Sequence, residues 1–285
     1  MCLVIFLGSG GGRFNLIKQL RSSGGFLIST KNFLISVDPG PGALTQMNKL
    51  KIDPTALDGI IITHNHIDHY LEAPLFIEAM TDYARRQKGF LIGSKSVVEG
   101  KEEENSNYEP VISSYHLSKI KEKIVLLPYE KKSIELKEKN FHFEIEGVPT
   151  KHEDKSGIGF VMSVNNKKIG YTSDSEFFLE QTRFFKNVDL LIANCLKPKD
   201  DKIPGHLDAS SLVELLNLAK PKVCIITHLG MKIILNGANK LAAQIEKESS
   251  VKTLAAVDGY FYDLKDEKFA KYSKVKRKEA QQKLL

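Results

Sequence analysis

The sequence predicts an α/β domain made of two similar halves, with sheets inside and helices outside. Apolar runs typical of buried strands, such as residues 59–63 and 188–193, alternate with helical patterns in both halves of the chain. No Pro/Gly/Ser-rich linker divides the 285 residues, and a chain of this length can bury a full core. Alternating strands and helices favour layers in which helices cover sheets.

The first half combines β-branched apolar runs with abrupt Gly/Pro breaks. The segment 38–42 (Asp-Pro-Gly-Pro-Gly) breaks the chain sharply, and Pro74 suits the first turn of a helix. The polar, mixed-charge stretch 94–123 is expected to be a loop or an exposed excursion. The expected elements are strands at 2–7, 26–28, 33–37 and 59–63, a short helix at 44–50, and a helix at 74–86.

In the second half, period-two alternation and turn residues mark the strands. Phe141, Phe143 and Ile145 alternate with polar residues, and residues 165–167 (Asn-Asn-Lys) predict a hairpin. Asp208 is expected to cap the helix that follows it. The expected elements are strands at 158–164, 168–172, 188–193, 223–227, 253–257 and 260–264, and helices at 208–219 and 238–247.

Composition excludes several classes of protein. Apolar residues make up 42% and charged residues 27%, and no run approaches 18 apolar residues, so neither disorder nor a membrane span is expected. The three cysteines, Cys2, Cys195 and Cys224, form no CxxC motif, which disfavours a disulfide scaffold or a cysteine zinc site. A reducing, cytoplasmic location is therefore expected.

The positive charge is concentrated at the end of the chain. Residues 265–285 contribute +5 of the formal net charge of +6. We expect one domain at 1–270 followed by a basic tail at 271–285. Such a tail is either a solvated terminus that aids solubility or an element that helps to hold nucleic acid.

Three of the eight histidines lie within six residues, at the end of the buried strand 59–63. His64 and His66 point the same way in an extended segment, because side chains alternate with period two, so both can bind one metal ion. Where the chain turns, Asp68 and His69 can face a second ion. Imidazole nitrogen and carboxylate oxygen suit Zn²⁺, Mn²⁺ or Fe²⁺. The spacing H-x-H-x-D-H therefore predicts a metal site rather than a polar turn.

This motif resembles that of the metallo-β-lactamase superfamily, and the resemblance runs over roughly residues 3–264. It implies a four-layer αββα sandwich of two similar halves. Asp38, in the segment 36–40 (Ser-Val-Asp-Pro-Gly), resembles the aspartate that steadies the metal loop. The other residues that match by context are His152 after 148–151 (Val-Pro-Thr-Lys), Asp174 within 170–175 (Gly-Tyr-Thr-Ser-Asp-Ser) and His228 within 226–230 (Ile-Thr-His-Leu-Gly).

The resemblance also implies a ligand set and a nucleophile. It implies two divalent ions, zinc foremost with manganese or iron as alternatives, and a hydroxide bridging them as nucleophile. Taken singly, Asp174 could instead cap a turn, His152 could be exposed, and His228 could be a satisfied core histidine. One ion would be held by His64, His66 and His152, the other by Asp68, His69 and His228, with Asp174 bridging both.

A further histidine points to one branch of the superfamily. His206, in the segment 204–210 (Pro-Gly-His-Leu-Asp-Ala-Ser), resembles the histidine that precedes a helix in ribonuclease Z and related phosphodiesterases. The resemblance implies that His206 stabilises charge on phosphate or protonates the leaving oxygen, and that it forms the catalytic set with Asp68. A surface loop histidine is the structural alternative.

The opening glycines also resemble that branch. Residues 8–12 (Gly-Ser-Gly-Gly-Gly) are expected to allow a tight turn beside the site, with Arg13 either a phosphate contact or a surface charge. The chain departs from ribonuclease Z in lacking a long arm that grips tRNA. The segment 94–123 is short and contains acidic residues at 102–104, a poor grip for RNA.

Three functions from different classes follow from these residues. The first is a dinuclear metal-dependent phosphodiesterase of the ribonuclease Z-like type, which acts on a small phosphodiester or on RNA. The second is a lactonase or thioester hydrolase that uses the same metals, since fold does not decide the substrate. The third is a metal-stabilised binding protein without enzymatic activity. No membrane partner is expected, and a homodimer is expected because this branch commonly dimerises.

Overall fold

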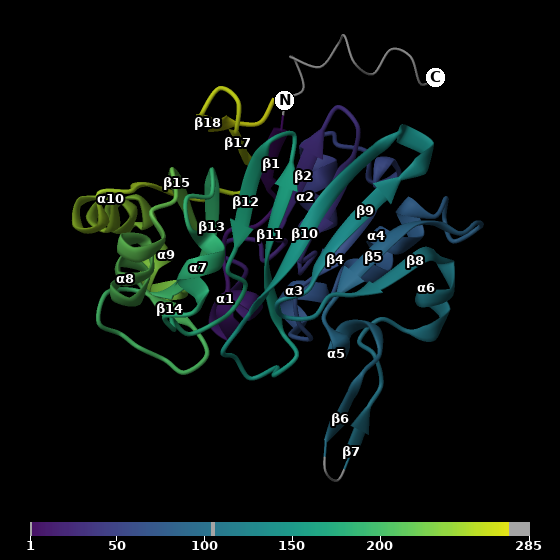
Figure 1. Ribbon diagram of the computed structural model, residues 1–285, viewed down its shortest axis with the longest axis horizontal. Coiled ribbons are helices and arrows are strands. Elements are labelled where there is room, and N and C mark those ends of the chain that lie inside the picture. The colour runs from purple at the N-terminus through teal and green to yellow at the C-terminus, as the bar shows by residue number, and fades with distance from the viewer. Residues whose placement is uncertain (1, 104–105, 274–285) are drawn as a thin grey trace.

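Two β-sheets pack face to face in the computed structural model, which describes residues 2–103 and 106–273 (Figure 1). The first sheet has the strand order β18-β17-β1-β2-β3-β4-β5-β8. Its strands are β1 (Cys2–Phe6), β2 (Phe26–Thr30), β3 (Leu34–Val37), β4 (Gly59–Ile62), β5 (Lys88–Gly93), β8 (Ile120–Val125), β17 (Tyr260–Asp263) and β18 (Lys268–Lys271).

The second sheet has the order β16-β15-β13-β12-β11-β10-β9, with β14 paired to β13. The two sheets follow the same plan: antiparallel strands come first, and parallel strands joined by helical crossovers follow. The predicted similarity of the two halves is visible in this plan. The strands are β9 (Lys131–Leu136), β10 (Phe141–Pro149), β11 (Ile158–Val164), β12 (Lys167–Tyr171), β13 (Leu190–Lys197), β14 (Leu207–Asp208), β15 (Val223–Thr227) and β16 (Lys252–Ala255).

Helices cover both outer faces, and Figure 1 shows α8 and α10 on one side of the two sheets and α4 and α6 on the other. Met47 of α2 and Phe76 of α4 pack on the first sheet, while Leu212 of α8 and Ile245 of α10 pack on the second. The order of layers is helix, sheet, sheet, helix, so the expected αββα sandwich is confirmed. The helices are α1 (Gly12–Lys18), α2 (Ala43–Lys49), α3 (Ile67–Tyr70), α4 (Ala73–Met80), α5 (Lys95–Val98), α6 (Ser114–Lys119), α7 (Gln181–Phe185), α8 (Ala209–Ala219), α9 (Met231–Asn236) and α10 (Ala238–Ser249), with 3₁₀ turns η1 (Pro54–Ala56) and η2 (Lys137–Lys139).

The central strands are apolar throughout because they are buried on both faces. In β1, Val4 and Phe6 point into the core between the sheets, while Leu3 and Ile5 point toward the helices. Side chains of a strand alternate between the faces of its sheet, so both sets need apolar partners. The continuous apolar runs at 2–7, 60–62 and 190–193 have this cause.

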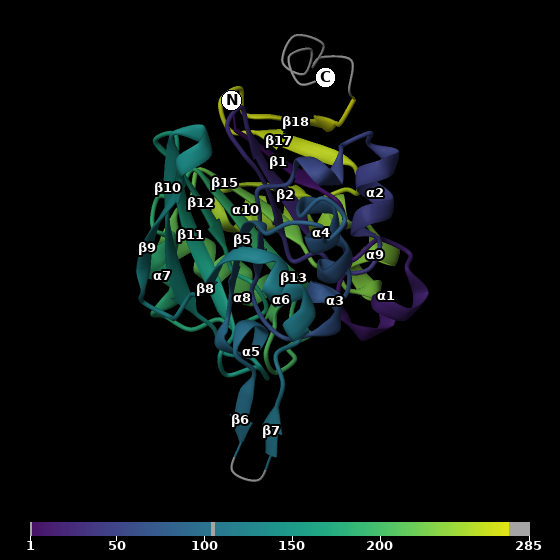
Figure 2. The same cartoon turned by 90° about the vertical axis from the view of Figure 1, so that its right-hand side faces the viewer.

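The segment 94–123 has more regular structure than a loop, and part of it is the exposed excursion that is the alternative expectation (Figure 1). It contains α5, a two-stranded ribbon of β6 (Lys101–Glu103) and β7 (Ser106–Tyr108), α6, and the edge strand β8. The ribbon projects away from the body in both views (Figures 1 and 2). Val97, Ile112 and Ile120 anchor the rest of the segment in the apolar cluster beneath the helices. These three apolar residues lie far apart among polar ones, so they form no periodic pattern from which helices or strands could be predicted.

Smaller differences concern the ends of elements. The helix expected at 74–86 ends at Met80, and Asp82, Tyr83 and Ala84 take positive φ angles of 56°, 57° and 58°, which leave the helical path. Residues 274–285, most of the expected basic tail, lie outside the described residues. No helix in the described ranges 2–103 and 106–273 has both the length and the apolar character needed to cross a membrane.

Candidate metal centre

Polar side chains gather where strands of both sheets end at one edge of the sandwich. His64 and His66 follow β4 of the first sheet, whereas His152, Asp174 and His228 follow β10, β12 and β15 of the second. Ligands commonly bind at the carboxyl ends of parallel strands, where loops are free to carry functional groups. The site therefore lies across the ends of both sheets.

The first group comprises His64, His66, His152 and Asp174, and its ligand atoms lie within 4.8 Å of one another. His152 Nε2 is 3.0 Å from His66 Nδ1, and His64 Nε2 is 3.9 Å from Asp174 Oδ2. His64 and Asp174 are buried, whereas His66 is partly exposed. The alternation of His64 and His66 on one extended segment brings both rings to the same place, as their spacing predicts.

The second group comprises Asp68, His69 and His228. His228 Nε2 lies 3.3 Å from Asp68 Oδ2. Asp174 Oδ2 lies 3.4 Å from His228 Nε2 and 3.5 Å from His69 Nε2, so this one oxygen borders both groups. All seven predicted ligands thus come together, in the two sets that the resemblance implies. That they bind metal stays a prediction.

Two buried nitrogen atoms support metal binding. His64 Nε2 and His69 Nε2 are both buried and have no hydrogen-bond partner. A buried polar atom without a partner costs about 1–3 kcal/mol, a cost that coordination to a cation removes. With neighbouring carboxylates, these imidazoles make a donor set that suits divalent zinc, manganese or iron. The residues present are therefore consistent with a dinuclear metal site.

The other nitrogen of most of these rings is fixed by a hydrogen bond. His69 Nδ1 donates to Asp38 Oδ2 at 2.9 Å, and His152 Nδ1 donates to the Gly205 carbonyl at 2.8 Å. Thr63 Oγ1 donates to Asp38, so its oxygen accepts from His64 Nδ1 at 3.1 Å. Each contact leaves Nε2 free to face the site, which is how outer-shell partners orient metal-binding histidines.

Asp38 fixes the metal loop, residues 63–69, by hydrogen bonds to both of its ends. Its carboxylate accepts the Thr63 amide at 2.8 Å, the Thr63 hydroxyl at 2.8 Å, His69 at 2.9 Å and the Tyr171 hydroxyl at 2.9 Å, and Asp38 itself is 1% exposed. Thr63 and His69 belong to the first half of the chain, and Tyr171 belongs to the second. One buried carboxylate thus ties the loop to both sheets.

The charge states suit cation binding. Burial lowers the pKa of His64 and of His66, so both rings are neutral at pH 7, the form that coordinates metal. Burial opposes the charge of Asp174 and of Asp68, but the facing imidazoles hold the pKa of each carboxyl well below its usual range. Burial also opposes the charge of His69, yet the surrounding carboxylates raise its pKa, so this ring carries a proton that a coordinating ion would displace. The centre therefore presents ionised carboxylates that attract cations.

The opening glycines pass directly beside the second group. The Gly12 amide donates to Asp68 Oδ2 at 3.3 Å, and a Cβ at Gly11 would lie 2.2 Å from the His228 ring. α1, which begins here, lies next to α3 in both views (Figures 1 and 2). The glycines lie beside the site as expected, but residues 8–11 form no tight turn; Gly10 instead makes an isolated bridge with Leu229.

His206 borders the centre from a third direction. β14 and the loop before it place His206 Nδ1 3.5 Å from Asp174 Oδ2, and its ring stacks on that of His228 at a centroid distance of 5.9 Å. Burial lowers the pKa of His206 to about 4, so the ring is neutral near pH 7. Asp208 caps α8 by accepting the Ser211 amide at 2.9 Å, as its position predicts.

Two residues that sequence reasoning missed also support the centre. Asp154, 1% exposed, accepts the Asn65 amide at 3.0 Å and the Ser96 hydroxyl, and so joins the metal loop to α5. Asn194 donates to Asp174 Oδ1 at 2.6 Å. A polar residue inside the apolar run of β13 was the available signal for Asn194, whereas nothing local marked Asp154.

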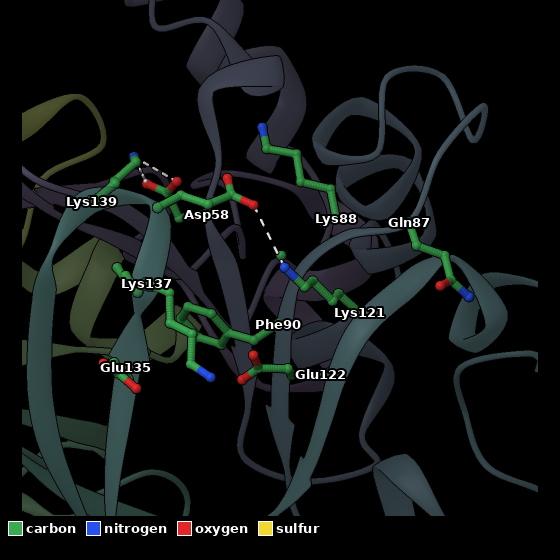
Figure 3. A pocket seen from close by; sticks show the side chains of 12 residues that line it. Asp58, Gln87, Lys88, Phe90, Lys121, Glu122, Glu135, Lys137 and Lys139 are labelled. Atoms are coloured by element: carbon green, nitrogen blue, oxygen red, sulfur yellow. Dashed lines mark hydrogen bonds and ion pairs between the residues drawn. The ribbon is translucent and has the colours of Figure 1, made fainter.

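A charged cavity of about 240 Å³ lies elsewhere, at the amino ends of β4 and β5 (Figure 3). Lys139 binds both carboxylate oxygens of Asp58, at 2.6 and 2.7 Å, and Lys121 lies 3.5 Å from Glu138. Lys88 donates to the Thr55 carbonyl at 3.2 Å. Lys139 and Lys121 are paired with carboxylates, and the pair of Asp58 with Lys139 joins the first sheet to the second across this cavity.

Comparison with known proteins agrees with this geometry. Residues 33–229 match the beta-lactamase superfamily domain, and the chain belongs to that family of metallo-β-lactamase fold hydrolases. An uncharacterized protein of Methanocaldococcus jannaschii is 38% identical over 275 residues, which cover 96% of this chain and 98% of that protein. A ribonuclease Z of Thermococcus onnurineus is 27% identical and covers 80% of this chain and 85% of its own length.

Solved structures show the same fold at low sequence identity. The metallo-β-lactamase fold protein YhfI from Bacillus subtilis has a TM-score of 0.71 at 18% identity and covers 92% of this chain and 98% of its own. A diphosphatase from the PhnP family has a TM-score of 0.65 at 16% identity, with 92% and 98% covered. The short form of human tRNase Z has a TM-score of 0.63 at 16% identity, with 92% and 99% covered. Fold and site together indicate a metal-dependent hydrolase.

Replacement of Asp38 by asparagine tests the carboxylate beneath the metal loop. We expect Asp38→Asn to lower the free energy of unfolding of the zinc-free protein by about 2–4 kcal/mol. Both carboxylate oxygens of Asp38 accept hydrogen bonds, so in either orientation the asparagine NH₂ group would face a donor. Urea unfolding measures this. Asp53→Asn, at an exposed cap where asparagine serves equally well, should change stability by less than about 0.5 kcal/mol. Equal effects of the two changes would contradict the role of Asp38.

Replacement of Gly11 tests the close approach to His228. We expect Gly11→Ala to displace the ring and to lower affinity at one of two zinc sites about tenfold or more, as measured by competition with a chromophoric chelator. Gly237→Ala is the control, since the three atoms nearest to a Cβ there belong to Lys240 and lie 3.5 Å or farther away, while its φ of 103° is strained for alanine. The control should lose stability and keep its zinc affinity. Unchanged affinity in Gly11→Ala would contradict the packing.

Proposed function

We propose that the protein is a dinuclear metal-dependent phosphodiesterase of the ribonuclease Z-like type. The observation that carries this proposal is the position of His206, whose Nδ1 lies 3.5 Å from the carboxylate shared by the two metal groups. A nucleophile generated beside the shared carboxylate needs a second group that stabilises charge on a phosphoryl oxygen or donates a proton to the leaving oxygen. His206 is in reach of both tasks.

Each residue then has a stated task. When bound, the paired ions acidify a water molecule and withdraw charge from a substrate oxygen. Asp174 is held by Asn194 and orients the two groups with respect to each other. His206, neutral near pH 7, donates a hydrogen bond to a phosphoryl oxygen or to the leaving oxygen. Asp68 is fixed by the Gly12 amide and keeps His228 in place.

Zinc is the proposed metal. Mixed imidazole and carboxylate ligands are usual for zinc, and they also accept manganese or iron. Relatives named ribonuclease Z, a structural neighbour that is a diphosphatase and another that is a tRNase Z support a phosphorus ester as the substrate. The match to these relatives is distant, and several ribonuclease Z sequences match only about a third of this chain, for example 33% in that of Thermococcus kodakarensis.

The proposed substrate is a phosphodiester, either a small molecule or RNA. The sequence of β6 includes Glu102 and Glu103, and carboxylates repel a phosphate backbone, which favours the small molecule. The proposed assembly is a homodimer. α1 supports it, since Phe14 and Ile17 are 81% and 78% exposed beside the centre.

Turnover with defined metals tests the reaction class. We expect protein reconstituted with Zn²⁺, Mn²⁺ or Fe²⁺ to hydrolyse bis(p-nitrophenyl) phosphate, and Asp68→Ala to abolish turnover, because the second metal group loses its carboxylate. A panel of lactones and thioesters is assayed in parallel. Hydrolysis of those substrates without phosphodiester hydrolysis would contradict the proposal, as would zinc binding without any turnover.

The role of His206 predicts a separate effect. We expect His206→Ala to lower phosphodiester turnover by about 10²–10⁴, since it removes an acid–base or charge-stabilising group, and to leave zinc affinity within a few-fold of the parent. His142→Ala, an exposed histidine on β10, is the matched control and should be fully active. Full activity of His206→Ala would exclude the role, and a large loss of zinc affinity would make His206 a ligand instead.

A further inference from the structure

His66 differs from its neighbours in how its outer nitrogen is held. The outer nitrogens of His64, His69 and His152 face a hydroxyl, a buried carboxylate and a carbonyl. His66 presents Nδ1, not Nε2, to the centre, as its 3.0 Å approach to His152 Nε2 shows. Its outer atom is therefore Nε2, and the carboxylate of Glu153 lies 3.5 Å from it.

We propose that Glu153 is a positioning residue that holds His66 with Nδ1 toward the first metal group. A neutral imidazole carries one proton, so Nδ1 is free to coordinate only when the proton sits on Nε2. A carboxylate 3.5 Å from Nε2 favours the proton on that nitrogen by electrostatic attraction, and so opposes rotation of the ring by 180°. Carboxylate, histidine and metal in this order form a common outer-shell arrangement.

The position of Glu153 in the fold strengthens this role. His66 follows β4 of the first sheet, and Glu153 lies in the loop between β10 and β11 of the second. The residues next to them, Asn65 and Asp154, also join these two loops, since the Asn65 amide donates to Asp154 at 3.0 Å. The neighbouring residue therefore already holds the Glu153 backbone at the correct distance, and only the side chain has to be placed.

Arg13 restrains that side chain. Its guanidinium lies 3.8 Å from the same Glu153 oxygen, and the two side chains are 88% and 71% exposed. Arg13 follows Gly12, whose amide donates to Asp68, so its backbone is fixed beside the centre. A pair this exposed is weak, so we expect Arg13 to act only through Glu153 and only by a few-fold.

Zinc affinity measures this role without any substrate. Zinc affinity of the full chain is titrated against a chromophoric chelator. We expect Glu153→Ala to lower the affinity of one of two zinc sites about tenfold. This is the low end of the range for outer-shell residues, because 3.5 Å is long for a hydrogen bond. Glu153→Gln should stay within about threefold of the parent, since its amide oxygen also accepts from Nε2. Affinity unchanged in Glu153→Ala, or equally weak in Glu153→Gln, would overturn the proposal.

The chain offers a matched control. Glu78 lies 3.5 Å from His116 Nε2, the same pairing at the same distance, outside the metal groups. Glu78→Ala should leave zinc affinity unchanged, and a loss equal to that of Glu153→Ala would show a general charge effect and overturn the specific role. Because no turnover is measured, failure of this proposal is distinguishable from failure of the proposed phosphodiesterase activity, although both rest on the same metal groups.

Two further readouts separate positioning from general stability. Long-range ¹H–¹⁵N correlation spectra of the zinc-loaded protein should show His66 protonated at Nε2, with faster solvent exchange of that proton in Glu153→Ala. Arg13→Ala should weaken zinc binding about two- to threefold alone and not at all in the Glu153→Ala background, because its effect passes through Glu153. Protonation at Nδ1, or additive effects of the two changes, would overturn the proposal.

Discussion

The buried carboxylate of Asp38 is the constraint on which the metal loop depends. An ionised group that is 1% exposed is tolerated only where donors replace its water, and here four donors from three residues do so. These donors fix Thr63 at the end of β4, the ring of His69 and the hydroxyl of Tyr171. The carboxylate thus sets the register between the two sheets at the edge where the site forms.

The seven clustered residues inherit their positions from this framework. The ends of β4, β12 and β15 that lead into the site are buried, so packing fixes the point at which each following loop begins. The histidines are already aimed by hydrogen bonds to Thr63, Asp38 and Gly205. Two of the nitrogens that face inward are left without partners, which is the cost of keeping the site ready for a cation. The unpartnered nitrogens of His64 and His69 lower the stability of the metal-free protein, while the hydrogen bonds around them keep the rings oriented.

Local sequence was sufficient where a pattern has one physical solution. The H-x-H-x-D-H spacing after a buried strand predicts two metal-facing groups, and the continuous apolar runs predict strands that helices cover on one side and a sheet on the other. Sequence was insufficient where contacts between residues far apart in the chain determine the local structure. Val97, Ile112 and Ile120 give the segment 94–123 its order, and Asp154 and Asn194 act through partners far along the chain. The opening helix α1 exposes Phe14 and Ile17, so it lacks the amphipathic pattern that identifies a helix.

The exposures around the centre indicate how a substrate must approach. The side chains of His64, His69 and Asp174 are 1%, 3% and 1% exposed, which closes the floor of the site. The side chains of His66 and His206 are 28% and 17% exposed. The open side of the centre is therefore formed by His66 of the first metal group and by His206. The segments along this open side are α1, the β10–β11 loop and the loop before β14. Because the ligands below them are held by buried contacts, these three segments can change in sequence, and with them the choice of substrate, while the centre stays as it is.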